Sequence, residues 1–340
     1  MTDEIEDYYE IEMIDEPTDE QLPKVIREWT ELFGQVSRQN EYPATLAFFN
    51  LLGSVLKDDL VIPFGFTKED SRIHICWIQN ARSGKSVLND FFTEIAKKTF
   101  GYIDDHENRE EPYHTVFDIT DTTDAALIGT TTKVPNPERA EAGQPREIEV
   151  PVLGALEGSG IALFDEFESI GIFTKKSHKE SVTMYFQKFM NTLTTDGYII
   201  DKKLAHGPTI ICKCERSVWA TSYVPEYFTE VIAQKGVLQR MFLYVREVPQ
   251  HTLNLMRREL ISSIGIIKER NSPTNKYSKA IFNIYNEVQS RRDDGVRPEE
   301  MVSFADGIQD VINLEYDSMI AYLGKCPEKV RKVVGSFETN

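Results

Sequence analysis

The sequence contains no long apolar run, no cysteine pair at metal-binding spacing and no basic residue near its start. Its four cysteines are scattered and form no Cys-x-x-Cys pair, so neither a zinc site nor a disulfide framework is expected. Because no stretch approaches the roughly 18 apolar residues of a membrane-spanning helix, we expect no membrane segment. The acidic first residues also lack the basic and apolar regions of a secretory signal. Together these absences predict a reduced, cytoplasmic setting.

Acidic residues are concentrated at the beginning of the chain. Residues 1–20 contain ten Asp or Glu and no Lys or Arg, and without them the net charge would change from −17 to −7. This composition favours a solvated, disordered tail, with a DNA-mimicking or partner-binding tail as the alternative. Because net charge governs solubility and non-specific binding, it does not exclude a local basic channel elsewhere.

Hydrophobic patterning divides the chain into four predicted parts. Residues 1–22 form the acidic tail, 23–58 the N-terminal helices, 59–248 the core, and 249–340 a C-terminal helical region. Within the core, strand-like and helix-like segments alternate, which predicts an α/β fold with a mainly parallel sheet.

The strongest functional signal is an apolar strand over residues 73–78, followed by a polar loop that ends in Gly-Lys-Ser and by an amphipathic helix. This order favours phosphate binding, because N–H groups of the loop and of the helix N-terminus would point at the anion. We expect Lys85 to reach the β- and γ-phosphates of ATP and the Ser86 hydroxyl to bind Mg²⁺. The predicted phosphate-binding residues are Asn80, Ala81, Arg82, Ser83, Gly84, Lys85, Ser86 and Val87.

The loop departs from the usual phosphate-binding pattern at one position. Gln79 occupies the place of the first glycine in Gly-x-x-x-x-Gly-Lys-Ser. Its backbone must therefore adopt a conformation that a side chain tolerates. A chance Gly-Lys-Ser on a surface turn is the alternative, which the strand and helix on either side disfavour.

A second candidate segment is an apolar strand, residues 160–164, that ends in carboxylates. Ligands of open α/β sheets bind at the carboxyl ends of strands, so we expect Asp165 to hold the magnesium ion. Glu166 is expected to orient the attacking water, with Glu168 as the substitute candidate for that role. The alternative is an ordinary strand that ends in a solvated acidic turn.

Two further positions are candidates for nucleotide sensing and transition-state stabilisation. Thr221 and Ser222 end a third apolar strand and are the predicted sensor residues, although a strand end capped by hydroxyls is an equal alternative. Arg240 lies between a glycine turn and another strand and is a candidate to stabilise transition-state charge. If Arg240 acts on the nucleotide of a neighbouring subunit, the protein must assemble into a ring or filament.

Two basic segments lie between the acidic strand and the third strand. The first is a Lys-rich loop, and the second is a predicted hairpin that is closed by residues 208–214. Lysines would neutralise phosphates and a tyrosine would stack on a base, although solvated charged loops are the alternative. The candidate nucleic-acid residues are Lys175, Lys176, Lys179, Tyr198, Lys202 and Lys203.

In their order along the chain, these motifs resemble the RecA-like ATPase domain of unknown function found in phage and plasmid primase-helicases. The resemblance covers roughly residues 40–248. It implies a P-loop ATPase core of the RecA-like or ASCE type and a viral or plasmid replicative helicase, in the cytoplasm of a bacterium or an infected cell. It also implies ATP and Mg²⁺ as cofactors, single-stranded DNA as partner and a hexameric ring, with the acidic tail available for replication proteins.

Three functions fit these motifs. The first is a nucleic-acid-stimulated ATPase that moves along single-stranded DNA. The second is a related ring motor that packages DNA or remodels proteins. The third is a helicase loader that binds ATP but hydrolyses it slowly, for which the absent first glycine is the best support.

Overall fold

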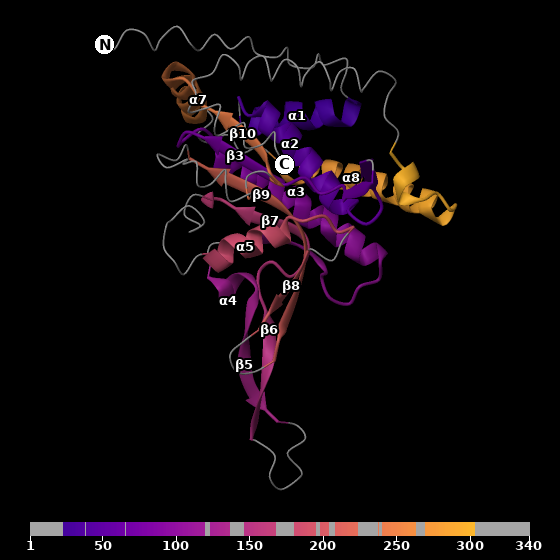
Figure 1. Cartoon of the computed structure of the whole chain (residues 1–340). Helices are drawn as coiled ribbons and strands as arrows, with labels where there is room; N and C mark the ends of the chain where they lie inside the picture. Colours follow the sequence, from indigo (N-terminus) through magenta and orange to yellow (C-terminus); the bar gives the residue numbers. More distant parts are fainter. Residues whose placement is uncertain are drawn as a thin grey trace.

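A parallel sheet forms the centre of the molecule in the computed structural model (Figure 1). Its strand order is β10-β3-β9-β7-β4, every neighbouring pair in that order is parallel, and β8 pairs antiparallel with β9. The predicted α/β fold with a mainly parallel sheet is therefore confirmed. The strands of this sheet are β3 (Ile75–Gln79), β4 (His114–Asp118), β7 (Gly158–Phe164), β8 (Ile199–Lys202), β9 (Ile210–Ser222) and β10 (Phe242–Arg246). The structure describes residues 23–37, 39–64, 66–119, 123–136, 146–167, 180–194, 198–203, 208–223, 237, 240–262 and 269–302.

The central strands are buried on both faces, which explains their nearly continuous apolar sequences. Side chains alternate between the two faces along each strand. In β3, Cys76 and Ile78 join one hydrophobic cluster, whereas Ile75 and Trp77 join the other. The sheet therefore separates two cores and needs cover on each side.

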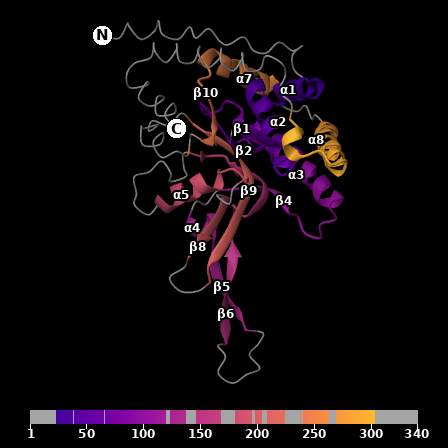
Figure 2. The ribbon, with the colours of Figure 1, turned by 45° about the vertical axis from the view of Figure 1, so that its right-hand side comes forward.

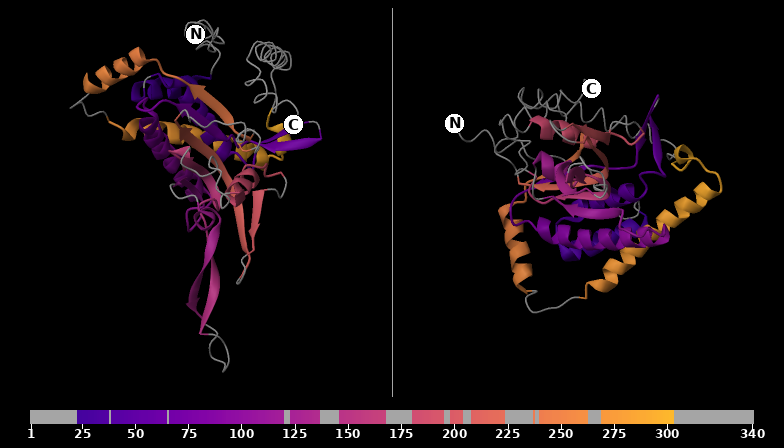
Figure 3. Two further views of the ribbon diagram at one scale, coloured as in Figure 1. Left: turned by 60° about the vertical axis from the view of Figure 1, so that its left-hand side comes forward. Right: turned by 90° about the horizontal axis from the view of Figure 1, so that it is seen from below.

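Helices supply that cover on both faces of the sheet (Figure 3). The cluster that contains Trp77 also includes residues of α1, α2, α3 and α8, and the opposite cluster includes residues of α5. The N-terminal helices thus share a core with the sheet. Among the described residues, the α-helices of at least ten residues are α1 (Lys24–Val36), α2 (Glu41–Val55), α3 (Lys85–His106), α5 (Glu180–Phe189), α7 (Gln250–Ser262) and α8 (Asn271–Asp293). The same residues include a short α-helix, α4 (Asp124–Leu127), and a 3₁₀ helix, η7 (Pro298–Glu300).

Two β-hairpins extend beyond the sheet at the edge where its strands begin (Figures 1 and 2). One is formed by β5 (Gly129–Pro135) and β6 (Glu147–Leu153), and the other by β8 and the first part of β9. The hairpin predicted around the Lys202–Lys203 pair is therefore confirmed. A third, separate hairpin consists of β1 (Val61–Phe64) and β2 (Thr67–Asp70).

The connections of the sheet create a switch point at β3 and β9. From β3 the chain crosses through α3 to β4 at one edge, whereas from β9 it crosses to β10 on the other side of β3. In open α/β sheets, ligands bind outside the carboxyl ends of strands at such a point. The Gly-Lys-Ser loop and Thr221 lie at these two strand ends. Within the described residues, no helix combines the length and apolarity needed to cross a bilayer.

His74, just before β3, makes the stability of the fold depend on pH. Its Nδ1 accepts a hydrogen bond from the Val218 N–H at 3.1 Å, and the side chain is buried. Burial, aided by the nearby Arg72 cation and opposed by Asp70, lowers the pKa of His74 from 6.5 to about 3. The unfolded chain therefore binds one more proton than the folded chain between these values, and stability falls as the pH decreases through this window.

We expect the free energy of unfolding contributed by His74 to fall by up to about 1.4 kcal/mol per pH unit below pH 6.5. His74→Asn keeps an acceptor for the Val218 N–H but cannot titrate. Denaturant unfolding of both proteins between about pH 5 and 6.5, above the range in which carboxylates titrate, measures the difference. Equal slopes for wild type and His74→Asn would show that His74 is not buried in its neutral form.

Candidate functional site

The turn between β3 and α3 carries the Gly-Lys-Ser sequence. Arg82 and Gly84 have positive φ values of 64° and 84°. A Cβ added at Gly84 would lie 2.4 Å from Ser37 Oγ, so the position requires glycine for space as well as for conformation. Gly84 is also the N-cap of α3. The first N–H groups and the positive dipole end of a 22-residue helix therefore face this turn.

Gln79 replaces the first glycine without backbone strain, because it is the last residue of β3 and has no positive φ. Its side chain is fully buried. Oε1 accepts a hydrogen bond from Trp77 Nε1 at 2.8 Å, and Nε2 donates one to Asn40 Oδ1 at 2.9 Å. A glutamine is thus accommodated as part of the hydrogen-bonded interior behind the loop.

Lys85 lies inside the loop. Its side chain is mostly buried, and Nζ donates to the backbone carbonyls of Gln79 at 2.5 Å and Asn80 at 2.9 Å. The ammonium also lies 4.7 Å from the ring centroid of Tyr223. The charge is therefore held at the centre of the turn, against the backbone that is expected to surround a phosphate.

The remaining residues of the predicted phosphate loop differ in their surroundings. Asn80 makes a reciprocal pair with Val248, whose N–H donates to Oδ1 at 2.8 Å and whose carbonyl accepts from Nδ2 at 3.3 Å. This pair joins the loop to the segment between β10 and α7. Ser83 Oγ donates to the Asn80 carbonyl at 2.7 Å. Ala81, Arg82, Ser86 and Val87 are exposed.

Asp165 lies against the helix that follows the loop. Its Oδ1 accepts hydrogen bonds from Asn89 Nδ2 at 2.7 Å and from Thr221 Oγ1 at 3.0 Å. Asn89 is three residues after Ser86 on α3, which places both on neighbouring turns of one helix face. The carboxyl end of β7, the carboxyl end of β9 and the first turns of α3 therefore meet at this carboxylate.

The two predicted sensor residues differ. Thr221 is fully buried and also donates to the Asp165 carbonyl at 2.8 Å. Ser222 Oγ instead donates to the Tyr223 carbonyl at 2.9 Å. Thr221 is thus the hydroxyl that the structure brings to Asp165. Glu166 is exposed beside it, and the substitute candidate Glu168 lies outside the described residues.

A second carboxylate stands at the end of the neighbouring strand. Asp118 is the last residue of β4 and pairs in register with Leu163, two residues before Asp165. Burial and the negative charge of Asp165 raise the pKa of Asp118, with Lys97 acting in the opposite direction. The charge of Asp165 therefore acts on the end of the neighbouring strand, where Asp118 is a second carboxylate to compare with Asp165 in cation binding.

Arg240 lies near the N-terminal ends of the sheet strands, whereas the Gly-Lys-Ser loop lies at their C-terminal ends. It precedes β10, whose first residue, Phe242, pairs with Ile75 at the beginning of β3, and its Nε donates to Asn191 Oδ1 at 3.1 Å. The five residues of β10 place the two ends of this strand roughly 13 Å apart. Arg240 therefore does not contribute to the site of its own chain.

The candidate nucleic-acid residues that the structure describes lie on or beside the β8–β9 hairpin, also away from the loop. Lys202 Nζ donates to the Gly129 carbonyl at 3.0 Å and so joins the two long hairpins, whereas Lys203 is exposed. Tyr198 precedes β8 and is half-buried. Lys175, Lys176 and Lys179 lie outside the described residues. Contact with nucleic acid stays a prediction for all six.

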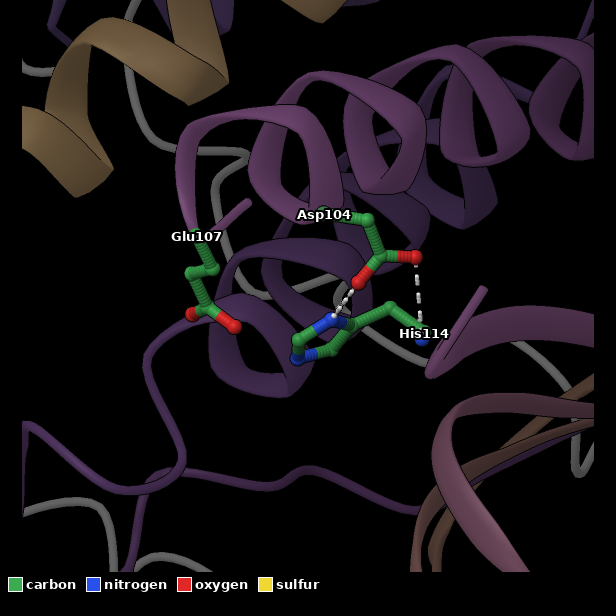
Figure 4. A group of neighbouring side chains, drawn as sticks. All are labelled: Asp104, Glu107 and His114. Atoms are coloured by element: carbon green, nitrogen blue, oxygen red, sulfur yellow. Dashed lines mark hydrogen bonds and ion pairs between the residues drawn. The ribbon is translucent and has the colours of Figure 1, made fainter. Parts of the chain in front are cut away.

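Asp104, Glu107 and His114 form a cluster of possible metal ligands near the beginning of β4 (Figure 4), with their ligand atoms within 4.8 Å of one another. A cavity of about 440 Å³ lies beside it, lined in part by Asp104, Arg109 and His114. Every carboxylate oxygen of the cluster already has a protein partner. Asp104 Oδ1 contacts His114 Nδ1 and Oδ2 accepts two backbone N–H groups, while the Glu107 oxygens contact Tyr285 and Arg109. We interpret the Asp104–Glu107–His114 cluster as a hydrogen-bonded network that joins α3, β4 and α8.

Sequence patterns did not identify three polar residues of the candidate site. Ser37, Asn40 and Asn89 are all buried. Each is a polar residue at a buried position, where an apolar residue is more usual. This exchange is the one feature of the sequence that could have indicated a special role for these residues. Apart from the bond between Asn40 and Ser37, their partners lie between 39 and 132 residues away along the chain, so the sequence alone does not reveal them.

Comparison with protein-family models gives no match for this chain, and comparison with curated proteins gives none either.

Proposed function

We propose that the chain is a P-loop nucleoside triphosphatase that hydrolyses ATP with Mg²⁺ and acts as a motor on single-stranded nucleic acid, as a phage or plasmid replicative DNA helicase does. The hydrogen bond from Asn89 to Asp165 is the observation that supports this most strongly. It brings the acidic strand end against the helix that begins at the Gly-Lys-Ser loop. A metal bound by Ser86 and Asp165 would then bridge the loop and the sheet.

The strand order supports the same proposal. β9 lies between β3, which leads into the loop, and β7, which ends at the acidic pair. Thr221 at the end of β9 contacts Asp165 and would lie between that carboxylate and the γ-phosphate of a nucleotide in the loop. Glu166, exposed beside Asp165, would orient the attacking water.

Arg240 and the lysines fit this proposal only in an assembly. Because Arg240 lies at the end of β10 that is distant from the Gly-Lys-Ser loop of its own chain, it would act on the nucleotide of a neighbouring subunit in a ring. The β8–β9 hairpin and Lys203 would then face a strand of DNA in a central channel. The hexamer and the channel are parts of the proposal that follow from the sequence resemblance.

The test is ATP hydrolysis by the purified chain with Mg²⁺, with and without single-stranded DNA. We expect hydrolysis that rises when single-stranded DNA is added and falls with increasing salt, because phosphate contacts release counterions. Hydrolysis that no nucleic acid affects would favour a packaging or remodelling ring. Binding without hydrolysis would favour a loader, although the strain-free fit of Gln79 weakens the main argument for it. A chain that does not bind Mg-ATP would exclude all three.

A further inference from the structure

A buried polar network holds the Gly-Lys-Ser loop from behind. The turn between α1 and α2 provides Ser37 and Asn40, and both side chains are buried. Asn40 Nδ2 donates to the Ser83 carbonyl at 2.7 Å and to Ser37 Oγ at 2.7 Å, and Ser37 Oγ donates to the Gly84 carbonyl at 2.9 Å. The loop carbonyls are thus fixed by a segment more than 40 residues earlier in the chain.

Fixing these carbonyls also fixes the direction of two N–H groups. In a trans peptide the C=O and the following N–H lie in one plane and point in opposite directions. The Ser83 carbonyl shares its plane with the Gly84 N–H, and the Gly84 carbonyl shares its plane with the Lys85 N–H. Since both carbonyls face the α1–α2 turn, both N–H groups point away from it, as an anion in the loop requires.

Gln79 completes the network from the other end of the loop. Its Nε2 donates to Asn40 Oδ1, and its Oε1 is occupied by Trp77. Asn40 is therefore hydrogen-bonded to the residue before the loop and to a residue within it. In a glycine-rich loop, backbone conformation alone must maintain the shape, whereas here a side-chain amide joins the two ends.

We propose that Asn40 is a positioning residue of the nucleotide site, and that the Asn40–Gln79 amide pair takes the role of the absent first glycine in shaping the phosphate loop. The proposal rests on the proposed nucleotide-binding function. It assigns to the α1–α2 turn a part in binding the triphosphate, without contact between Asn40 and the nucleotide.

The chain offers a matched control for this proposal. Asn50, on α2, is also fully buried, and its Nδ2 donates to two backbone carbonyls, those of Ile73 at 2.6 Å and Val218 at 2.9 Å, while its Oδ1 accepts no hydrogen bond from the described residues. Neither carbonyl belongs to the loop. Asn40→Ala and Asn50→Ala therefore each remove a buried amide whose Nδ2 donates two hydrogen bonds, and only Asn40 contacts the loop.

The experiment measures equilibrium binding of Mg-ATP by calorimetry, and the thermal midpoint, for the full chain and each variant. We expect Asn40→Ala to raise the dissociation constant about 10- to 100-fold, the range found when partners that orient ligand-binding groups are removed. Asn50→Ala is expected to lower the thermal midpoint to a similar extent while the dissociation constant changes by no more than about twofold.

The outcomes separate the two proposals. Equal weakening of Mg-ATP binding by both variants would reduce Asn40 to a structural residue and overturn the positioning role. If Asn40→Ala does not fold, Ser37→Ala removes the bond to the Gly84 carbonyl and the bond from Asn40 Nδ2, and it leaves the bonds of Asn40 to Ser83 and Gln79 in place. It is expected to weaken binding several-fold, and unchanged binding would overturn the proposal. A wild-type chain that folds but does not bind Mg-ATP would exclude the nucleotide function itself.

Discussion

Replacing Lys85 by alanine is expected to lower the rate of ATP hydrolysis by about 10²- to 10³-fold, the usual effect of removing one group that stabilises transition-state charge. The ammonium lies inside the loop, bonded to the carbonyls of Gln79 and Asn80. No other lysine or arginine of the described residues donates to these carbonyls. Measured kcat and KM for Mg-ATP test this expectation, and we expect both to become less favourable.

The same substitution also affects stability, so the comparison needs a control. Lys85→Ala leaves the carbonyls of Gln79 and Asn80 without this mostly buried donor, at a cost of about 1–3 kcal/mol in the free energy of unfolding. Lys98→Ala on the same helix removes a more exposed ammonium that pairs with Glu94 and donates to Thr274, and it is expected to lower the free energy of unfolding by about 1 kcal/mol. Lys98→Ala should retain full hydrolysis. Wild-type turnover by folded Lys85→Ala would contradict the phosphate-binding role of the loop.

Asp165→Asn is expected to abolish most Mg²⁺-dependent hydrolysis while it preserves the fold. The asparagine Oδ1 can still accept the hydrogen bonds that Asn89 and Thr221 donate. Only the negative charge is lost, and magnesium is bound in nucleotide sites by one or two carboxylates plus phosphates. We expect the Mg²⁺ concentration for half-maximal hydrolysis to rise at least about tenfold, with little change in the thermal midpoint.

Asp118→Asn provides the comparison, because this carboxylate ends the neighbouring strand. Its raised pKa reflects burial and the charge of Asp165, so its removal relieves a repulsion. Asp118→Asn is expected to leave the Mg²⁺ dependence nearly unchanged. A larger increase in the required Mg²⁺ concentration for Asp118→Asn than for Asp165→Asn would assign the metal to the carboxylate that ends β4 and not to the one that follows β7. A normal Mg²⁺ dependence in both variants would mean that neither carboxylate holds the ion.

Features that depend on neighbours along the chain were predictable from the sequence. The strand, loop and helix over residues 73–106 follow from an apolar run, a glycine in the left-handed conformation and an amphipathic segment. The β8–β9 hairpin follows from strand-like residues on both sides of the Lys202–Lys203 pair. The second of the N-terminal helices, α2, begins at Glu41, two residues before Pro43, because proline is tolerated in the first turn.

The sequence identified which polar residues lie at strand ends, but it did not predict which of them contact Asp165. Thr221 and Ser222 are adjacent hydroxyls at the end of one strand, and only the structure distinguishes them. Since successive side chains of a strand point to opposite faces, one reaches Asp165 and the other bonds locally. Arg240 was identified as a candidate cation, but its position at the far edge of the sheet depends on the direction and register of β10.

The sequence by itself determined the alternation of strands and helices, the Gly-Lys-Ser turn and the carboxylates that end β7, because each depends on local conformation and burial. Tertiary structure alone decided which strands are neighbours and therefore that Asn89 and Thr221 meet Asp165. It also decided that Asn40 supports Gln79 and Ser83. These contacts join segments separated by tens of residues. They form only when folding has brought those segments together, which costs loop-closure entropy that no local sequence pattern reflects.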